Sequence, residues 1–269
     1  MTAEAARDRS PRLPPAFRLV ALEEIDSTSA EAKRLAVAGA EDGTLVWARR
    51  QTAGYGRQGR AWTSEPGNLF VSLIVRPDCG LAEAAQFSFI TAVALGEAIG
   101  SVAPPLLEVT YKWPNDVLLN GRKGAGILLE SKGDAGGRLE WLVIGVGVNV
   151  ARFPDDTRLP ATSLRYEGCP ADVTEVDLLE ALARHLLAWV NTWLEDGFRP
   201  VRAAWLRHAQ GLGESIEVRL PRETLKGVFE DLDDSGTLAL RLPDGSLRHV
   251  AAGEVYLPGE MVRSGDNGG

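Results

Sequence analysis

The chain has 269 residues, of which 45% are hydrophobic and 25% charged, and its formal net charge is -8. This composition is typical of a globular protein with a sizeable core, and the acidic balance argues against broad nucleic-acid binding, which depends on basic side chains. No apolar run approaches the roughly 20 residues of a membrane span, and the N-terminus lacks the apolar stretch of a signal peptide, so we expect a cytoplasmic protein without membrane contact.

The cysteines and histidines are few and scattered. Cys79 and Cys169 follow no metal-ligand spacing, so two free thiols are predicted rather than a disulfide. The three histidines are isolated from one another, which argues against a histidine-based metal site.

Apolar periodicity divides the chain into a mixed part and an all-β part. In the mixed part, strands are predicted at residues 17–22, 44–48, 69–75, 107–111 and 141–150, and helices at 30–37, 81–102, 176–195 and 200–208. Beyond these, short strands at 214–220, 225–232, 238–242 and 247–251 are separated by turn dipeptides and predict a small β-barrel. We therefore expect a main domain at 17–211 and a barrel domain at 212–259, between a disordered leader at 1–16 and a disordered tail at 260–269.

Two glycine patterns refine the strand predictions. Asn120-Gly121 lies between two apolar runs and predicts a type I′ hairpin. Gly145 and Gly147 interrupt a buried strand, which indicates close approach by a ligand or by a neighbouring backbone. If the strand through residues 140–150 lies at a sheet edge, it offers pairing across a homodimer.

The tetrad Asp26-Ser27-Thr28-Ser29 precedes the first predicted helix. Such residues cap a helix N-terminus, and the same hydroxyl and N–H groups can hold a polar group of a ligand.

Residues 51–62, QTAGYGRQGRAW, form a segment that we call the arginine loop. Gly54, Gly56 and Gly59 allow close backbone approach to a ligand, and Arg57 and Arg60 stand between them. A locally cationic loop in an acidic protein indicates a bound anion, most simply a phosphate. The alternative is a mobile surface loop with solvated arginines.

A lysine follows the strand predicted at 107–111. Lys112 stands among bulky side chains, where partial desolvation strengthens the field of an ammonium group on an anion. Asn115-Asp116 either turns the backbone or helps to hold a divalent cation, with Asp116 as the possible ligand. Taken together, the arginine loop and the strand-end lysine suit adenylate-forming chemistry, in which fixed cations stabilise charge on the α-phosphate of ATP.

Four ordered strings then carry a resemblance: DSTS at 26–29, QTAGYGRQGRAW at 51–62, KWPNDVLLNGRKGAGIL at 112–128 and GVGVNV at 145–150. Between about residues 17 and 257 the chain closely resembles the biotin–protein ligases. The resemblance implies an α+β fold, with a mixed sheet and flanking helices as in class II aminoacyl-tRNA synthetases. It also implies an ATP-dependent ligase that forms biotinyl-5′-AMP with magnesium and transfers biotin to a lysine of a biotin carboxyl carrier protein of acetyl-CoA carboxylase.

The resemblance also assigns residues. Arg57 and Lys112 would be catalytic, with Lys112 bridging the biotin carboxylate and the α-phosphate. Biotin would meet Ser27, Thr28, Ser29, Gln51, Tyr55, Gly56, Arg57, Lys112, Gly124 and Gly126, and the adenylate would meet Arg57, Arg60, Trp62, Lys112, Asn115 and Asn149.

Two residues depart from the family's usual pattern, which often has Asn at position 29 and Arg at position 55. Ser29 can still donate a hydrogen bond, whereas Tyr55 removes one cation from the arginine loop. Many bacterial members carry an N-terminal helix-turn-helix domain, and the short segment before the first strand implies an enzyme without that DNA-binding role. Two rivals remain: a lipoate–protein ligase, and a non-catalytic nucleotide sensor or repressor.

Overall fold

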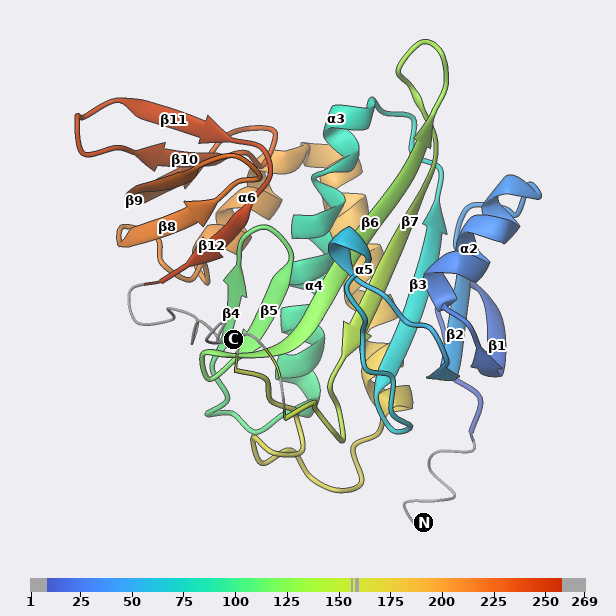
Figure 1. The fold of residues 1–269 in the computed structure, drawn as a ribbon. Helices are drawn as coiled ribbons and strands as arrows, with labels where there is room; N and C mark the ends of the chain where they lie inside the picture. Colours follow the sequence, from blue (N-terminus) through green and yellow to red (C-terminus); the bar gives the residue numbers. More distant parts are fainter. Residues whose placement is uncertain (1–8, 156, 158–159, 258–269) are drawn as a thin grey trace, which may run out of the picture.

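The computed structural model describes residues 9–155, 157 and 160–257, and within them two β-sheets and several helices (Figure 1). The larger sheet has seven strands in the order β1-β2-β3-β7-β6-β5-β4. Its strands are β1 (Arg18–Ile25), β2 (Thr44–Gln51), β3 (Leu69–Val75), β4 (Val109–Lys112), β5 (Asp116–Leu119), β6 (Arg122–Gly133) and β7 (Leu139–Val148). Only β1 and β2 pair in parallel, so the predicted mixed sheet is confirmed.

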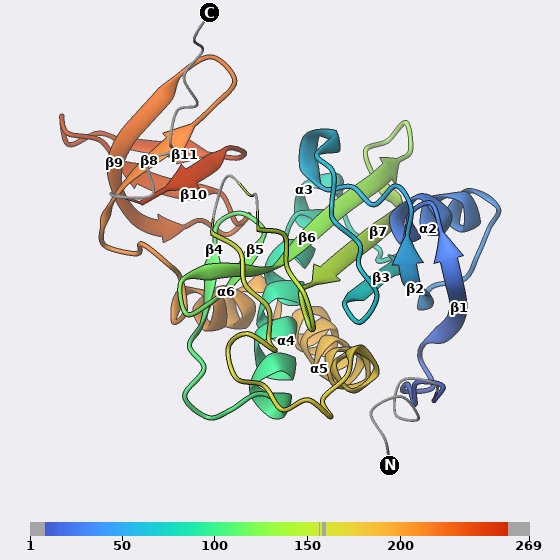
Figure 2. The same cartoon turned by 60° about the horizontal axis from the view of Figure 1, so that its bottom comes forward.

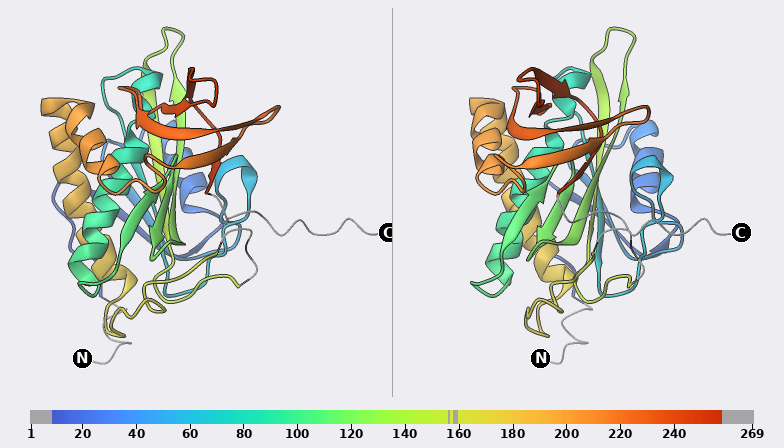
Figure 3. Two further views of the ribbon diagram at one scale, coloured as in Figure 1. Left: turned by 90° about the vertical axis from the view of Figure 1, so that its left-hand side faces the viewer. Right: turned by 60° about the vertical axis from the view of Figure 1, so that its left-hand side comes forward.

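Helices cover both faces of this sheet, as the side views of Figure 3 show. They are α2 (Thr28–Val37), α3 (Leu81–Ala84), α4 (Phe87–Val102), α5 (Glu175–Asp196) and α6 (Phe198–Leu206). Alternate residues of β2 serve the two faces: Leu45 and Trp47 join the large core that includes α4 and α5, whereas Val46 joins a smaller core beneath α2. This period of two is what a sheet buried on both faces requires.

The helix predicted at 81–102 is two helices. Ala85 and Gln86 form a turn between α3 and α4, where Gln86 binds the carbonyl of Asp234 and the indole of Trp193. Residues 81–102 are also long and apolar enough to cross a membrane, which the sequence predictions did not include, but 67% of an 18-residue stretch within them is buried inside the fold. A buried core helix accounts for this apolar composition.

The C-terminal strands form the second sheet, in the order β11-β10-β9-β8-β12. They are β8 (Ser215–Arg219), β9 (Thr224–Leu232), β10 (Leu238–Arg241), β11 (Leu247–Val250) and β12 (Glu254–Tyr256). Figure 2 shows this sheet grouped apart from the larger one. A separate all-β module is confirmed, but β11 and β12 lie at opposite edges of the described sheet, so closure into a barrel is not.

The hairpin between β5 and β6 is confirmed, since Asn120 and Gly121 both have positive φ (47° and 74°), as a type I′ turn demands. The edge-strand argument for a homodimer is wrong, because β7 pairs with β3 on one side and β6 on the other. The edges of the larger sheet are β1 and β4.

The predicted disordered leader requires a partial correction. Arg9 pairs with Asp177 and Glu180 at 2.6 and 2.5 Å, and the backbone N–H of Arg12 donates to Glu180. The acidic first turns of α5 thus attract residues 9–12, as a helix N-terminus rich in carboxylates does for cations. Residues 1–8 and the tail at 260–269 lie outside the described residues.

Candidate active site

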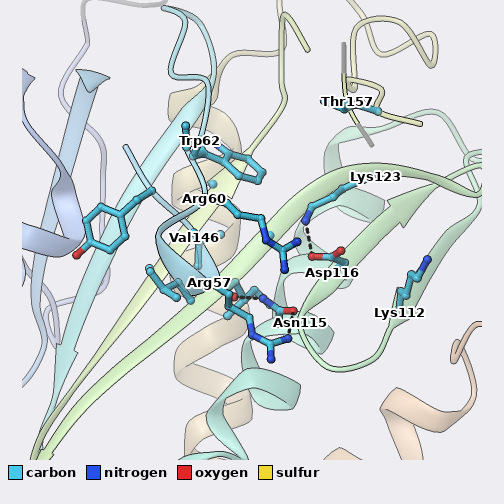
Figure 4. Close-up of a pocket in the computed structure, with 18 of the residues that line it drawn as sticks. Arg57, Arg60, Trp62, Lys112, Asn115, Asp116, Lys123, Val146 and Thr157 are labelled. Atoms are coloured by element: carbon cyan, nitrogen blue, oxygen red, sulfur yellow. Dashed lines mark hydrogen bonds and ion pairs between the residues drawn. The ribbon is translucent and has the colours of Figure 1, made fainter. Parts of the chain in front are cut away.

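A pocket of about 470 Å³ lies over β6 and β7, beneath the arginine loop (Figure 4). The start of α2, the β4–β5 turn and β12 complete its wall. The predicted site residues that line it are Thr28, Ser29, Gln51, Tyr55, Gly56, Arg57, Arg60, Trp62, Lys112, Asn115, Asp116, Gly126 and Asn149. Its volume suits a small organic ligand.

At one end of the pocket, buried hydroxyls form a chain. Ser29 Oγ lies 3.0 Å from Ser72 Oγ, Ser72 donates to Thr28 Oγ1 at 2.9 Å, and Thr28 Oγ1 donates to Gln51 Oε1 at 3.1 Å. Gln51 Nε2 continues the chain to Ser64 Oγ at 2.9 Å. These groups are neutral and fixed by one another, which suits recognition of an uncharged polar group.

The residues of the tetrad at 26–29 divide between the helix cap and the pocket wall. Ser27 is the N-cap of α2 and accepts from Ala30 N at 3.4 Å, outside the pocket lining, while Thr28 and Ser29 enter the pocket. The helix cap is thus confirmed for Ser27, and ligand binding by Thr28 and Ser29 stays a prediction. Ser72, on β3 and fully buried, links Thr28 to Ser29 and was missed, because a lone serine in a β-prone run gives no signal.

The strand glycines make room for side chains. A Cβ on Gly147 would lie 2.6 Å from the Trp62 ring, and one on Gly126 would lie 3.1 Å from it. Since Gly126 and Gly147 are cross-strand partners, they form a bare platform on which the indole rests. A Cβ on Gly145 would lie 2.5 Å from Ser29 Oγ, so side chains approach both Gly145 and Gly147. Both also line the pocket, and close approach by a ligand stays a prediction.

Gly124 lies elsewhere than expected. It is buried, a Cβ there would lie 2.5 Å from the Leu119 side chain, and it does not line the pocket. The β5–β6 pairing passes from Ala125 to Lys123 without a partner for Gly124, which marks a β-bulge. The bulge brings Lys123 onto the same side of β6 as Gly126, whose notional Cβ is 3.6 Å from Lys123 Cε.

The arginine loop is an ordered turn, with an antiparallel bridge between Tyr55 and Ala61. Gly56 N donates to Arg60 O at 2.8 Å and Trp62 N donates to Gly54 O at 2.9 Å. Positive φ at Gln58 (58°) and Gly59 (71°) reverses the chain.

The tip of this loop contacts the C-terminal sheet. Arg60 pairs with Glu254, and Arg57 Nη1 donates to the carbonyl of Gly253 at 3.4 Å and to Asn115 Oδ1 at 3.3 Å. Burial lowers the pKa of Arg57 from its ordinary value, which marks a partly desolvated guanidinium. An anion that entered here would therefore meet a cation weakly shielded by water.

Two lysines line the pocket in different places. Lys112 is 4% exposed and its Nζ lies 5.6 Å from the centre of the Tyr256 ring of β12. Lys123 Nζ lies 2.6 Å from Asp116 Oδ1 and 5.7 Å from the centre of the Trp62 ring. In Figure 4, Lys123 lies by Trp62 and Asp116, and Lys112 lies to the far side. The resemblance assigned the bridging role to Lys112, and Lys123 was not among the predicted site residues.

The side-chain amides of Asn115 and Asn149 are hydrogen-bonded to the backbone. Asn115 Nδ2 donates to the carbonyl of Ile127 at 2.6 Å, and Asn149 Nδ2 donates to the carbonyl of Thr162 at 3.0 Å. These bonds orient the side chains at the pocket wall, and the Oδ1 of Asn115 faces Arg57. The described residues contain no cluster of three or more His, Cys, Asp or Glu side chains able to hold a metal ion.

Comparison with known families divides the chain into the same two parts as the two β-sheets do. The family model described as Biotin/lipoate A/B protein ligase family matches residues 13–207, and that of the Biotin protein ligase C terminal domain matches residues 211–257. The chain belongs to the biotin/lipoate A/B protein ligase family. Over 239 residues it is 43% identical to the biotin–[acetyl-CoA-carboxylase] ligase of Paracoccus denitrificans, a match that covers 87% of this chain and 98% of that protein. The resemblance to the biotin–protein ligases, and the prediction of an enzyme of that kind, are confirmed.

Solved structures agree. The biotin protein ligase from Aquifex aeolicus, in complex with biotin and ATP, matches with a TM-score of 0.75 and 26% identity, over 89% of this chain and 97% of that one. The ligase from Leishmania major, in complex with biotinyl-5-AMP, matches with a TM-score of 0.59 and 27% identity, over 89% and 100%. The same fold thus holds the vitamin, the nucleotide and their adduct in proteins similar to this family member.

Proposed function

We propose that this protein joins biotin to ATP as biotinyl-5′-AMP and then transfers biotin to a lysine of a biotin carboxyl carrier protein of acetyl-CoA carboxylase. The observation that carries the proposal is a single pocket with a neutral hydroxyl chain at one end and four cationic side chains at the other: Arg57, Arg60, Lys112 and Lys123. A ligand that is polar but uncharged at one end and anionic at the other fits this division.

The neutral end would take the polar ring head of biotin. Thr28, Ser29 and Gln51 offer oxygen and nitrogen atoms whose directions are set by Ser72 and Ser64. Because these partners already hold the side chains in place, and Ser72 is fully buried, the site would lose little conformational freedom when the vitamin binds.

The charged end would host the first step. An oxygen of the biotin carboxylate attacks the α-phosphorus of ATP, a new O–P bond forms, and the bond to the β-phosphate oxygen breaks, releasing pyrophosphate. Negative charge on the α-phosphate oxygens grows in the transition state, and preorganised cations stabilise it.

We assign the cation nearest this carboxylate to Lys123, which projects over the glycine platform beside Trp62. The incoming carboxylate would replace Asp116 as the partner of Lys123, or Asp116 would keep one hydrogen bond from the Lys123 ammonium group. Lys112, beside Tyr256, and Arg57 would support the phosphate from the β12 side.

In the second step the amine of the carrier lysine attacks the carbonyl carbon of the adduct. A C–N bond forms, the C–O bond to phosphate breaks, the amine nitrogen gives up a proton to water, and AMP leaves with the same cations around its phosphate. The arginine loop would cover the adduct meanwhile and exclude water, which protects a reactive mixed anhydride from hydrolysis.

Magnesium would come with the nucleotide. Asp116 and Asn115 offer oxygen atoms on the pocket wall, but Asp116 is paired with Lys123 and the pocket supplies few other carboxylates. This fits an ion held mainly by phosphates and water, whose charge would offset that of the phosphates.

The test is ATP-dependent transfer of biotin to a carboxyl-carrier domain, measured by mass shift, alongside pyrophosphate release with biotin or lipoate. We expect transfer and pyrophosphate release with biotin only. Release with lipoate alone would favour a lipoate–protein ligase. Tight, sequence-specific retardation of DNA in a mobility-shift assay would contradict our prediction that the chain does not read DNA.

A further inference from the structure

Three side chains join the arginine loop to the sheet: Tyr55, which lines the pocket, and Glu130 and Lys33, which do not. Tyr55 Oη donates to Glu130 Oε2 at 2.9 Å, and Lys33 Nζ donates to Glu130 Oε1 at 2.6 Å. Lys33 Nζ also lies 5.4 Å from the centre of the Tyr55 ring. The three residues come from the loop, from β6 and from α2, and we call them the loop anchor.

We propose that the loop anchor holds the arginine loop over the pocket before substrates bind, so that Tyr55, Glu130 and Lys33 are positioning residues for the reaction. The inference rests on the proposed function only in taking the covered pocket as the site of chemistry.

The anchor acts on the end of the loop that the phosphate does not reach. At the tip, Arg57 and Arg60 bind Gly253 and Glu254, and an incoming phosphate competes for those guanidinium groups. Glu130 is outside the pocket lining, so its bonds to Tyr55 and Lys33 persist while the tip exchanges partners. The loop therefore remains attached throughout the exchange.

The backbone carries the effect of the anchor to the tip. Tyr55 is bridged to Ala61, and the flanking bonds from Gly56 N to Arg60 O and from Trp62 N to Gly54 O close the turn. Holding Tyr55 against β6 thus restricts the motion of Arg60 and Trp62, although neither residue contacts Glu130. Restricting these residues before binding lowers the entropy lost when they close on a ligand.

The protonation states of Tyr55 and Lys33 favour lasting hydrogen bonds to Glu130. Burial raises the pKa of Tyr55, so its hydroxyl keeps the proton that it donates. Burial lowers the pKa of Lys33, but hydrogen bonds to Glu130 and Tyr55 raise it further, leaving it above its ordinary value. The carboxylate of Glu130 is then shared by a neutral donor and a cationic donor around neutral pH.

The test is trypsin cleavage after Arg57 and Arg60 in the ligand-free full chain, with fragments identified by mass. Tyr55→Phe keeps the ring and removes only the donor, and Lys33→Met keeps the stem and removes the charge. Losing one such hydrogen bond should speed cleavage within the loop by about 3- to 10-fold in either variant. Lys132→Met is the matched control, because Lys132 makes a similar pair with Glu140 on the outer surface and should leave loop cleavage unchanged.

A second readout separates positioning from catalysis. We expect Lys33→Met, at a residue outside the pocket lining, to raise the KM for ATP and to increase the release of free adenylate, with kcat for adenylate formation close to that of the wild type. Glu130→Gln should speed cleavage less than Tyr55→Phe through the Tyr55 contact, since an amide oxygen still accepts from the Tyr55 hydroxyl. Equal cleavage rates in wild type, Tyr55→Phe and Lys33→Met would overturn the proposal. If the wild type failed to ligate biotin while the cleavage differences persisted, only the proposed function would fall.

Discussion

The two ends of the pocket are built on different principles. The hydroxyl end is made of neutral groups from α2, β2 and β3, which satisfy one another within the sheet. At the charged end, cations on the loop, β4 and β6 are partnered by groups of the pocket itself, such as Asp116 and Glu254. The groups of the first end already pair with one another, whereas under the proposed function the second end would exchange its internal partners for phosphate.

This difference has an energetic consequence. A buried neutral chain loses stability when one member is removed, because its neighbours are left without partners. A cation that only exchanges one anion for another contributes chiefly where charge grows, in the transition state. Substitutions at the hydroxyl end should therefore affect folding and biotin binding together, and substitutions at the charged end should affect the rate.

The sharpest comparison is between Lys123→Ala and Lys112→Ala. We expect Lys123→Ala to slow adenylate formation by about 10²- to 10³-fold, the usual cost of removing one group that stabilises a developing oxyanion. Lys112→Ala should cost less, and Lys132→Ala, on the outer end of β6, should have no effect. Single-turnover pyrophosphate release measures all three. A larger loss in Lys112→Ala would restore the bridging role that the sequence assigned to that residue.

The glycine platform links the two ends. Gly147→Ala would place a methyl group 2.6 Å from the Trp62 ring and force the indole from β7. Overpacking of this kind costs about 1–3 kcal/mol, which corresponds to roughly 5- to 150-fold weaker binding of the adenylate. Isothermal titration with a non-hydrolysable adenylate analogue measures the change. Combining Gly147→Ala with Trp62→Ala should show no added loss; full additivity would mean that the indole does not rest there.

Removing the central hydroxyl tests the neutral end. Ser72→Ala leaves Thr28 and Ser29 without their shared partner, so the free energy of unfolding should fall by about 1–2 kcal/mol and the KM for biotin should rise. Urea denaturation and steady-state kinetics give both values. The control is Ser101→Ala, an exposed helical serine that donates to Ala98 O. A change in kcat with no change in stability would contradict the division between the two ends.

The smallest effect concerns the carboxylate before α2. Hydrogen bonds from Arg34 and from the Ser27 backbone lower the pKa of Asp26 from 3.8 to about 2. Its stabilising contribution is therefore complete above pH 3.8 and is lost as the pH falls through about 2. The contribution is small because Asp26 is half exposed and screened by water. Urea midpoints of the wild type and Asp26→Asn should differ slightly at pH 6 and converge near pH 2; a constant difference would exclude this carboxylate as the cause.

The sequence by itself determined the type of most elements and the ingredients of the site. Apolar periodicity found the strands and helices, and Asn120-Gly121 fixed a hairpin, because these signals act between residues close in the chain. The four strings at 26–29, 51–62, 112–128 and 145–150 identified the family for the same reason: each is a local segment of backbone and side chains.

Only the tertiary structure decided which side chains meet. A bulge at Gly124 places Lys123 and Gly126 on one side of β6, although simple alternation would separate residues three apart. Strand order put β7 in the centre of the sheet, brought Ser72 to Thr28, and brought Glu254 of β12 to Arg60 across almost two hundred residues. The sequence showed only that Tyr55 stands where relatives often have an arginine. In the fold its hydroxyl donates a hydrogen bond to Glu130. Such contacts depend on register and packing between distant segments, which no local pattern encodes.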